Sequence, residues 1–247
     1  MDLVSVIIPY YQKRKFISET VNSALKQSYK NLEILIIYDD ENCVDLNFIE
    51  EIKERDSRIS IIKNNKNMGA GISRNIGISK STGKYIAFLD ADDIWKSDKL
   101  SKQIGFMIQN DYQVSHTSYS IINKDKKITG SRKAKNFFVL GQLLKSCDIG
   151  TSTVILKKNL INEHMKFASL STKEDFVLWL RLLEKKVKIY GLDENLSLWT
   201  KSSSSLSSST TQKILDGFRV YYKYMNFNFF KSIYYLICLS INFLIKK

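Results

Sequence analysis

Short apolar runs alternate with amphipathic segments along the first part of the chain. The run 4–8 is β-branched and is followed by Pro9, which cannot donate to a strand ladder. Apolar residues then recur at helical spacing over 16–29, and a second apolar run occupies 32–38. Strands that alternate with helices are typical of βαβ units. We therefore expect an α/β fold in which helices flank a mostly parallel sheet.

The same reasoning predicts elements as far as residue 184. Further strands are expected at 59–62, 84–89, 114–122 and 153–156. Further helices are expected at 48–52, 71–80, 99–109 and 173–184. Because the composition changes only after residue 201, we expect one domain over 1–201 with a trailing appendage.

The appendage has two parts. Residues 202–211 are nearly all Ser and Thr and have little to bury, which predicts a linker. Residues 212–247 are rich in Tyr, Phe, Ile and Leu, and their longest uncharged run, 232–245, is shorter than the roughly 20 residues that span hydrocarbon. We expect one or two amphipathic helices that lie in a membrane interface, or that pack on the domain or on a partner subunit.

The 247 residues carry a net charge of +13, which calls for an anionic partner. Nucleic acid, anionic lipid and diphosphate-bearing substrates all qualify. One basic stretch, 124–145, is equally well explained as a solvated surface. The other follows Asp216, where the chain has five cations and no acid. Because aromatic residues are interleaved with these cations, an anionic membrane surface explains the second stretch better than solvent does.

Two features indicate the compartment. The chain has no basic and apolar leader with a small-residue cleavage site, so we expect the amino terminus to stay in the cytoplasm. Cys43, Cys147 and Cys238 lie far apart without metal-ligand spacing, so we expect reduced thiols.

The strongest chemical signal is the run Asp90-Ala91-Asp92-Asp93, directly after a predicted strand. Three carboxylates within four residues repel one another, so a cation among them makes electrostatic sense. Carboxylates without His or Cys suit Mg²⁺ or Mn²⁺, which share their remaining positions with substrate phosphates. The alternative is an acidic turn that caps the next helix. Asp39 and Asp40 also follow a strand, and ligands of open α/β sheets bind at those strand ends.

Other chemistries lack their motifs. Residues 69–74 carry Arg where the dinucleotide fingerprint requires its third glycine, and 77–84 lacks P-loop spacing. His116 and His164 are isolated, and no Ser-His-Asp arrangement can be argued. These absences speak against an NAD enzyme, an NTPase and a triad hydrolase.

An ordered set of motifs resembles the family 2 glycosyltransferases, whose fold is the Rossmann-like GT-A fold. The set comprises Val4–Tyr11, Asp39-Asp40, Asn67–Gly69 with Arg74–Gly77, and Asp90–Asp93. Residues 3–110 carry the resemblance, and Thr172–Asp175 matches a later acidic motif of the family. It implies a nucleotide-sugar half over 1–110 and an acceptor half over 111–201.

The resemblance also implies residue roles at the donor site. Pro9 and Tyr11 would border the base, and Asp40 or Asp39 would hydrogen-bond uracil. Asp90 would contact the ribose or the sugar. Arg74 would lie near the sugar or the diphosphate. Asp92 would ligate the metal ion that binds the diphosphate.

Asp175 would be the catalytic base, which takes the proton from the acceptor hydroxyl during an inverting displacement. As an acid in the first turn of a helix, it also suits a simple cap. Trp179, one turn later, would be an acceptor-sugar platform or a core residue.

The implied function is transfer of a hexose, glucose or galactose, from a UDP-sugar to a lipid-linked acceptor such as GlcNAc-diphospho-undecaprenol. The product would carry a β-linkage in O-antigen or another surface polysaccharide, made peripherally at the cytoplasmic face of a bacterial inner membrane. Two alternatives are a sugar-phosphate nucleotidyltransferase and a non-catalytic basic module. We expect no nucleic-acid partner, because acids gather at strand ends of an otherwise cationic chain.

Overall fold

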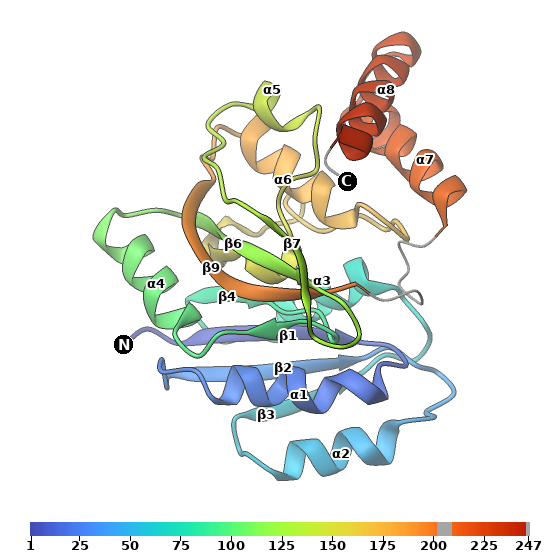
Figure 1. The fold of residues 1–247 in the computed structure, drawn as a ribbon. Helices are drawn as coiled ribbons and strands as arrows, with labels where there is room; N and C mark the ends of the chain where they lie inside the picture. The colour runs from blue at the N-terminus through green and yellow to red at the C-terminus, as the bar shows by residue number, and fades with distance from the viewer. Residues whose placement is uncertain (202–208, 246–247) are drawn as a thin grey trace.

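A computed structural model describes residues 1–201 and 209–245; most of the predicted 202–211 linker lies outside the described residues. Within those ranges the chain forms a mixed sheet with helices on both faces (Figure 1). The strands are β1 (Val4–Tyr10), β2 (Leu32–Tyr38), β3 (Ile59–Lys63), β4 (Tyr85–Phe88), β5 (Ile94–Trp95), β6 (Val114–Ile122), β7 (Ile128–Arg132), β8 (Ile155–Lys157) and β9 (Tyr190–Thr200). The helices are α1 (Arg14–Leu25), α2 (Leu46–Glu54), α3 (Ala70–Lys80), α4 (Lys99–Gln109), α5 (Leu140–Leu143), α6 (Glu174–Glu184), α7 (Thr210–Arg219) and α8 (Phe229–Ile245).

The sheet runs in the order β3-β2-β1-β4-β8-β6-β9-β5, with β7 paired to β6. Strands β3, β2, β1 and β4 run parallel to one another, as the alternating pattern predicts. Beyond β4 the pairings are antiparallel, except that β6 and β9 run parallel. The expected α/β fold with a mostly parallel sheet is confirmed, and the acidic motifs at 39–40 and 90–93 follow strands of the parallel part.

The two-residue period of the strands divides the core into two layers. Ile7 of β1 joins the layer that contains α3 and α6. Val6 and Ile8 face the opposite layer, against α1, α2 and α4. Because both faces are covered, the strands are apolar throughout rather than alternating.

Three predicted elements have the expected bounds: the 32–38 strand, the 99–109 helix and the 114–122 strand. Strand β9 was missed, because Gly191, Asp193, Glu194 and Asn195 interrupt any apolar alternation. Its formation depends on β6, which pairs with it along most of its length. Strand β7 was missed for a similar reason, since it lies in the basic stretch 124–145.

The appendage forms α7, a π-helical turn at Val220–Tyr224, and α8. Figure 1 shows α7 and α8 beside α6, at the end of the molecule opposite α2. Val220 and Tyr221 are fully buried in the α6 layer, and Tyr221 Oη donates to Leu144 O at 2.6 Å. No helix among the described residues is long and apolar enough to cross a membrane.

Gly77 permits the close approach of α3 to the sheet. A Cβ at this position would lie 2.5 Å from Ile7 Cγ2 and 3.3 Å from Ile37 Cδ1. We expect Gly77→Ala to lower the free energy of unfolding by about 1–3 kcal/mol, because the added methyl overpacks the core. Gly105 in α4 is the control, since a Cβ there meets nothing within 4 Å. Gly105→Ala should stabilise by up to about 1 kcal/mol. Urea unfolding measures both, and equal effects would contradict the packing argument.

Candidate active site

The acidic motifs meet at the carboxyl ends of the parallel strands. Asp39 and Asp40 directly follow β2. Asp90 follows β4 after a single intervening residue, Leu89. β1 lies between these two strands, so its carboxyl-end loop opens between the two motifs. This edge of the sheet is where open α/β folds bind their ligands.

Asp39 ties together the backbone before α3. Its Oδ1 accepts from Asn64 Nδ2 at 2.7 Å and from Met68 N at 2.8 Å, and its Oδ2 accepts from Gly69 N at 2.8 Å. Gly69 has φ of 81°, a conformation that glycine adopts without a steric cost. Both carboxylate oxygens of Asp39 therefore hold the loop that starts α3.

Asp40 has fewer internal partners. It is buried, accepts from Asn42 N at 3.1 Å, and receives only a long contact of 3.4 Å from Gln12 Nε2. Tyr11, beside Gln12, is 40% exposed. Gln12 therefore covers Asp40 from the loop that follows β1, and Tyr11 is accessible to a ligand in that loop.

Arg74 joins the two halves of the site. Its buried guanidinium donates to Asp90 Oδ1 at 2.5 Å and to Glu174 Oε1 at 2.7 Å, and it lies over the Phe167 ring at 5.2 Å. Burial opposes its charge, but the two carboxylates outweigh burial and raise the pKa of Arg74. The ion pairs hold the end of β4 beside the start of α6.

Glu174 and Asp175 occupy the first turn of α6. Burial raises the pKa of Glu174 to about 7; Arg74 acts against this shift and Asp175 adds to it. Asp175 is half-buried, and its Oδ2 accepts from Thr151 Oγ1 at 2.6 Å while Oδ1 accepts from Phe176 N at 2.7 Å. The Asp175 carboxylate is thus held in a defined orientation at the edge of the site.

The three carboxylates of the 90–93 run have different environments. Asp92 Oδ2 pairs with Lys13 Nζ at 2.8 Å; burial raises the pKa of Asp92, and Lys13 opposes that shift. Asp93 is buried, accepts from Ser152 Oγ at 2.5 Å and from Thr200 N at 3.0 Å, and burial raises its pKa well above the usual range. Asp93 is therefore a structural residue, whereas Asp90 and Asp92 are partly exposed and each pairs with a cation.

A 3₁₀ turn at Thr151–Thr153 connects the two acidic motifs. Thr151 bonds Asp175, and Ser152 Oγ donates to Asp93 and accepts from Asp90 N at 3.0 Å. Sequence reasoning missed Glu174, Ser152 and Lys13. The acidic motif Thr172–Asp175 was a usable signal for Glu174, because it contains that residue. Ser152 and Lys13 belong to no recognisable spacing.

A divalent ion would find few protein ligands here. The described residues contain no group of three or more His, Cys, Asp or Glu side chains that could hold one. Carboxylates alone suit Mg²⁺ and Mn²⁺, which accept one or two protein ligands and complete their shell with phosphates and water. The single carboxylate of Asp92 would therefore fit an ion that arrives with a diphosphate.

Two sequence-based alternatives are decided by burial. Trp179 is completely buried against Phe88 and Phe167, so of the two alternatives it is a core residue and not an acceptor platform. His116 is also buried, with Nε2 2.7 Å from Lys135 O, and burial lowers its pKa to about 4. His116 is therefore a structural residue.

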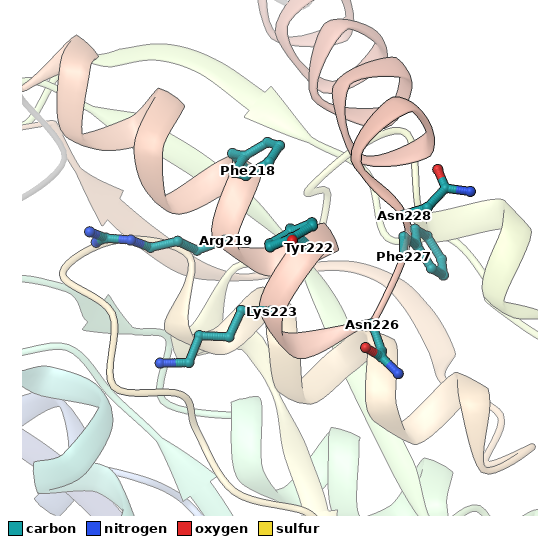
Figure 2. Close-up of a pocket in the computed structure, with 7 residues that line it drawn as sticks. All are labelled: Phe218, Arg219, Tyr222, Lys223, Asn226, Phe227 and Asn228. Atoms are coloured by element: carbon teal, nitrogen blue, oxygen red, sulfur yellow. The ribbon is translucent and has the colours of Figure 1, made fainter.

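A groove of about 660 Å³ lies on the appendage rather than at the strand ends. Figure 2 shows Arg219 at the end of α7, Tyr222 and Lys223 on the π-helical turn that follows it, and Phe227 and Asn228 just before α8. Cationic and aromatic side chains therefore share this surface.

The sequence matches the model of glycosyl transferase family 2 over residues 5–163. It is 43% identical over 188 residues to the Escherichia coli UDP-Glc:alpha-D-GlcNAc-diphosphoundecaprenol beta-1,3-glucosyltransferase WfaP, covering 76% of this chain and 73% of that protein. It is 35% identical over 236 residues to WfgD, an Escherichia coli enzyme with the same description, covering 95% and 91%. The putative teichuronic acid biosynthesis glycosyltransferase TuaG of Bacillus subtilis is 32% identical over 231 residues, covering 93% and 91%.

The solved structure of S. aureus TarS 1–349 in complex with UDP-GlcNAc has a TM-score of 0.71 and 21% identity, and covers 89% of this chain. This chain spans 64% of the length of that structure. The likeness confirms the GT-A fold. The protein is a GT-A glycosyltransferase, and it belongs to glycosyl transferase family 2. Family membership also speaks against the nucleotidyltransferase and the non-catalytic module.

The raised pKa of Glu174 predicts a pH-dependent stability. Between the ordinary value of 4.5 and about 7, the folded chain keeps a proton that the unfolded chain has lost. Stability should therefore fall as the pH rises through this window, by about 3 kcal/mol for a shift of this size. In Glu174→Gln this contribution is absent, so the stability difference between the two proteins should change with pH in the same window. Urea unfolding at pH 5 and pH 7.5 measures it. A constant difference would show that Glu174 titrates normally.

Proposed function

We propose that this chain is an inverting hexosyltransferase that moves glucose, or else galactose, from a UDP-sugar to GlcNAc-diphospho-undecaprenol or a related lipid-linked acceptor. The product is a β-linked disaccharide lipid for O-antigen or another surface polysaccharide. The Arg74 bridge carries the proposal, because it holds a donor-side carboxylate, Asp90, beside the acidic motif that contains Asp175. The descriptions of WfaP and WfgD favour glucose as the sugar and a 1,3 linkage.

The loop after β1 and the end of β2 would bind the nucleotide. Pro9 and Tyr11 border the base, and Tyr11 is accessible for stacking. Asp40 is the better candidate for the uracil hydrogen bond, since the oxygens of Asp39 are already used by Asn64 and the backbone. For Asp40 to reach the base, the long contact with Gln12 must open.

Asp92 would ligate Mn²⁺ or Mg²⁺, and Asp90 would contact the ribose or the sugar. A bound divalent ion supplies compensation for the charge that develops on the departing diphosphate. Lys13 gives the Asp92 carboxylate a positive counter-charge in this structure. Arg74 is committed to two carboxylates, so it positions them near the sugar and diphosphate instead of binding phosphate as a free cation.

Asp175 would act as the base. One of its oxygens takes the proton from the acceptor hydroxyl as that hydroxyl attacks the anomeric carbon. Hydrogen bonds from Thr151 and the Phe176 amide fix the plane of the Asp175 carboxylate. The side chain therefore loses little rotamer freedom when it accepts the proton. Attack opposite the leaving diphosphate inverts an α-linked donor into a β-linked product.

The appendage would hold the enzyme at an anionic membrane surface, peripherally, on the cytoplasmic face of the inner membrane. Exposed apolar side chains repeat along α8 at helical spacing: Phe230, Tyr234, Ile237, Ile241 and Leu244. The 82% exposure of Phe230 is unusual for a side chain of its size. Cations accompany this face, among them Lys231, whose Nζ lies 3.9 Å from the Phe227 ring centroid. An apolar face with flanking cations suits the interface of an anionic bilayer.

Two substitutions should separate donor binding from transfer. Asp92→Asn removes a metal-ligating charge, so Mn²⁺-dependent binding of UDP should weaken by at least about tenfold. Asp175→Asn removes the base, so binding of UDP should stay unchanged while transfer falls by about 10²–10⁴-fold. Calorimetry with Mn²⁺ and with EDTA measures binding, and transfer from UDP-glucose to a GlcNAc-diphosphate lipid measures activity. Normal turnover by Asp175→Asn would assign the base elsewhere.

The membrane proposal is tested by point substitution, because truncation would also remove buried Val220 and Tyr221. Replacing Phe230, Ile237 and Ile241 with Ser should weaken binding to phosphatidylglycerol vesicles by at least about tenfold. The reason is that each substitution removes apolar surface that would be buried in the lipid interface. The matched control replaces Val44, Ile108 and Ile128, which are exposed elsewhere on the protein. Equal pelleting of both variants would rule out α8 as the membrane contact.

A further inference from the structure

The appendage contains a fully buried carboxylate, Asp216 of α7. Its Oδ2 accepts from Thr172 N at 3.0 Å and from Thr172 Oγ1 at 3.1 Å. Its Oδ1 pairs with Arg219 Nη1 at 3.1 Å. A buried ion is stable only when its oxygens are satisfied, so Asp216 fixes the position of Thr172 as firmly as that of its own helix.

Thr172 lies two residues before Glu174, where α6 begins. Between them, Lys173 has φ of 62°, in the left-handed region. That conformation costs a non-glycine residue about 1–2 kcal/mol, so the local sequence does not favour it. An external contact must therefore hold this turn. The two hydrogen bonds that Thr172 donates to Asp216 supply such a contact.

The appendage touches the same turn at a second point. A Cβ on Gly217 would lie 3.6 Å from Lys173 Cε and 2.9 Å from Leu236 Cδ1. Glycine at this position therefore lets α7 approach α8, and the Lys173 side chain of the turn lies within ordinary contact distance. Phe176 packs edge-on against Tyr221 at 6.4 Å, which extends the contact into the first turn of α6.

We propose that Asp216 is a positioning residue for transfer: it orients Glu174 and Asp175 through Thr172, and it makes the seated appendage part of the frame of the active site. The inference rests on the proposed catalytic role of Asp175. Asp216 touches neither of these acids directly, and its other partner, Arg219, is half exposed and lines the groove in Figure 2. One carboxylate thus connects the surface of the appendage to the turn that precedes the base.

Asp216→Ala tests the inference, with Asp216→Asn as the conservative variant. Asparagine can keep both Thr172 bonds through its carbonyl oxygen, whereas alanine loses them. We expect Asp216→Ala to lower kcat by at least about tenfold while KM for the UDP-sugar changes less than about twofold. Asp216→Asn should restore most of kcat.

Glu33→Ala is the matched control for a purely structural effect. Glu33 accepts from Thr82 N at 2.6 Å and from Thr82 Oγ1 at 2.9 Å, the same pair of bonds that Asp216 makes with Thr172. It lies near the amino end of β2, at the opposite edge of the sheet from the site. Glu33→Ala should lose stability without a change in kcat. If Asp216→Ala also loses stability without a change in the kcat of its folded fraction, the inference is wrong.

Hydrogen exchange gives a readout that needs no activity. Amides of residues 172–176 should exchange faster in Asp216→Ala than in wild type, and at the wild-type rate in Glu33→Ala. Unchanged exchange there overturns the inference even if the wild-type chain transfers no sugar. A wild-type chain that fails to transfer, with faster exchange in Asp216→Ala, contradicts the proposed function and leaves the structural link intact.

Discussion

The buried guanidinium of Arg74 is the interaction on which the rest of the site depends. Removing a cation from water is costly, and Asp90 and Glu174 offset that cost only if both remain within hydrogen-bonding distance. Helix α3, the end of β4 and the start of α6 are therefore fixed relative to one another. Loss of the guanidinium would leave two carboxylates without their counter-charge, so the geometry of the site and its stability are coupled.

Charge compensation also explains why acids gather in a cationic protein. Asp92 is paired with Lys13, and Asp93 is enclosed by Ser152 and a backbone amide. Burial disfavours the charged forms of both carboxyls and raises their pKa, and the Lys13 cation opposes that effect at Asp92. A metal with a diphosphate would bring both a cation and its own anion, so it can bind without leaving a large uncompensated charge.

The candidate site was predictable where a strand delivers a residue directly. Asp39, Asp40 and Asp90 follow apolar runs, and parallel strands bring such positions to one edge. The partners of these acids were not predictable, because they come from distant segments. Ser152 lies 62 residues from Asp90, and Glu174 lies 100 residues from Arg74. No local period encodes contacts of that range.

The sequence by itself determined the elements with strong periodicity, the two-sided core, and the family motifs, because side-chain period and strand-end placement are local properties. Only the tertiary structure decided the pairing of β9 with β6, whose polar residues give no strand signal. It also decided the seating of α7 on the turn before α6. That seating brings the buried carboxylate of Asp216 to Thr172, beside a lysine whose backbone is left-handed, and each of these residues is ordinary within its own stretch of sequence.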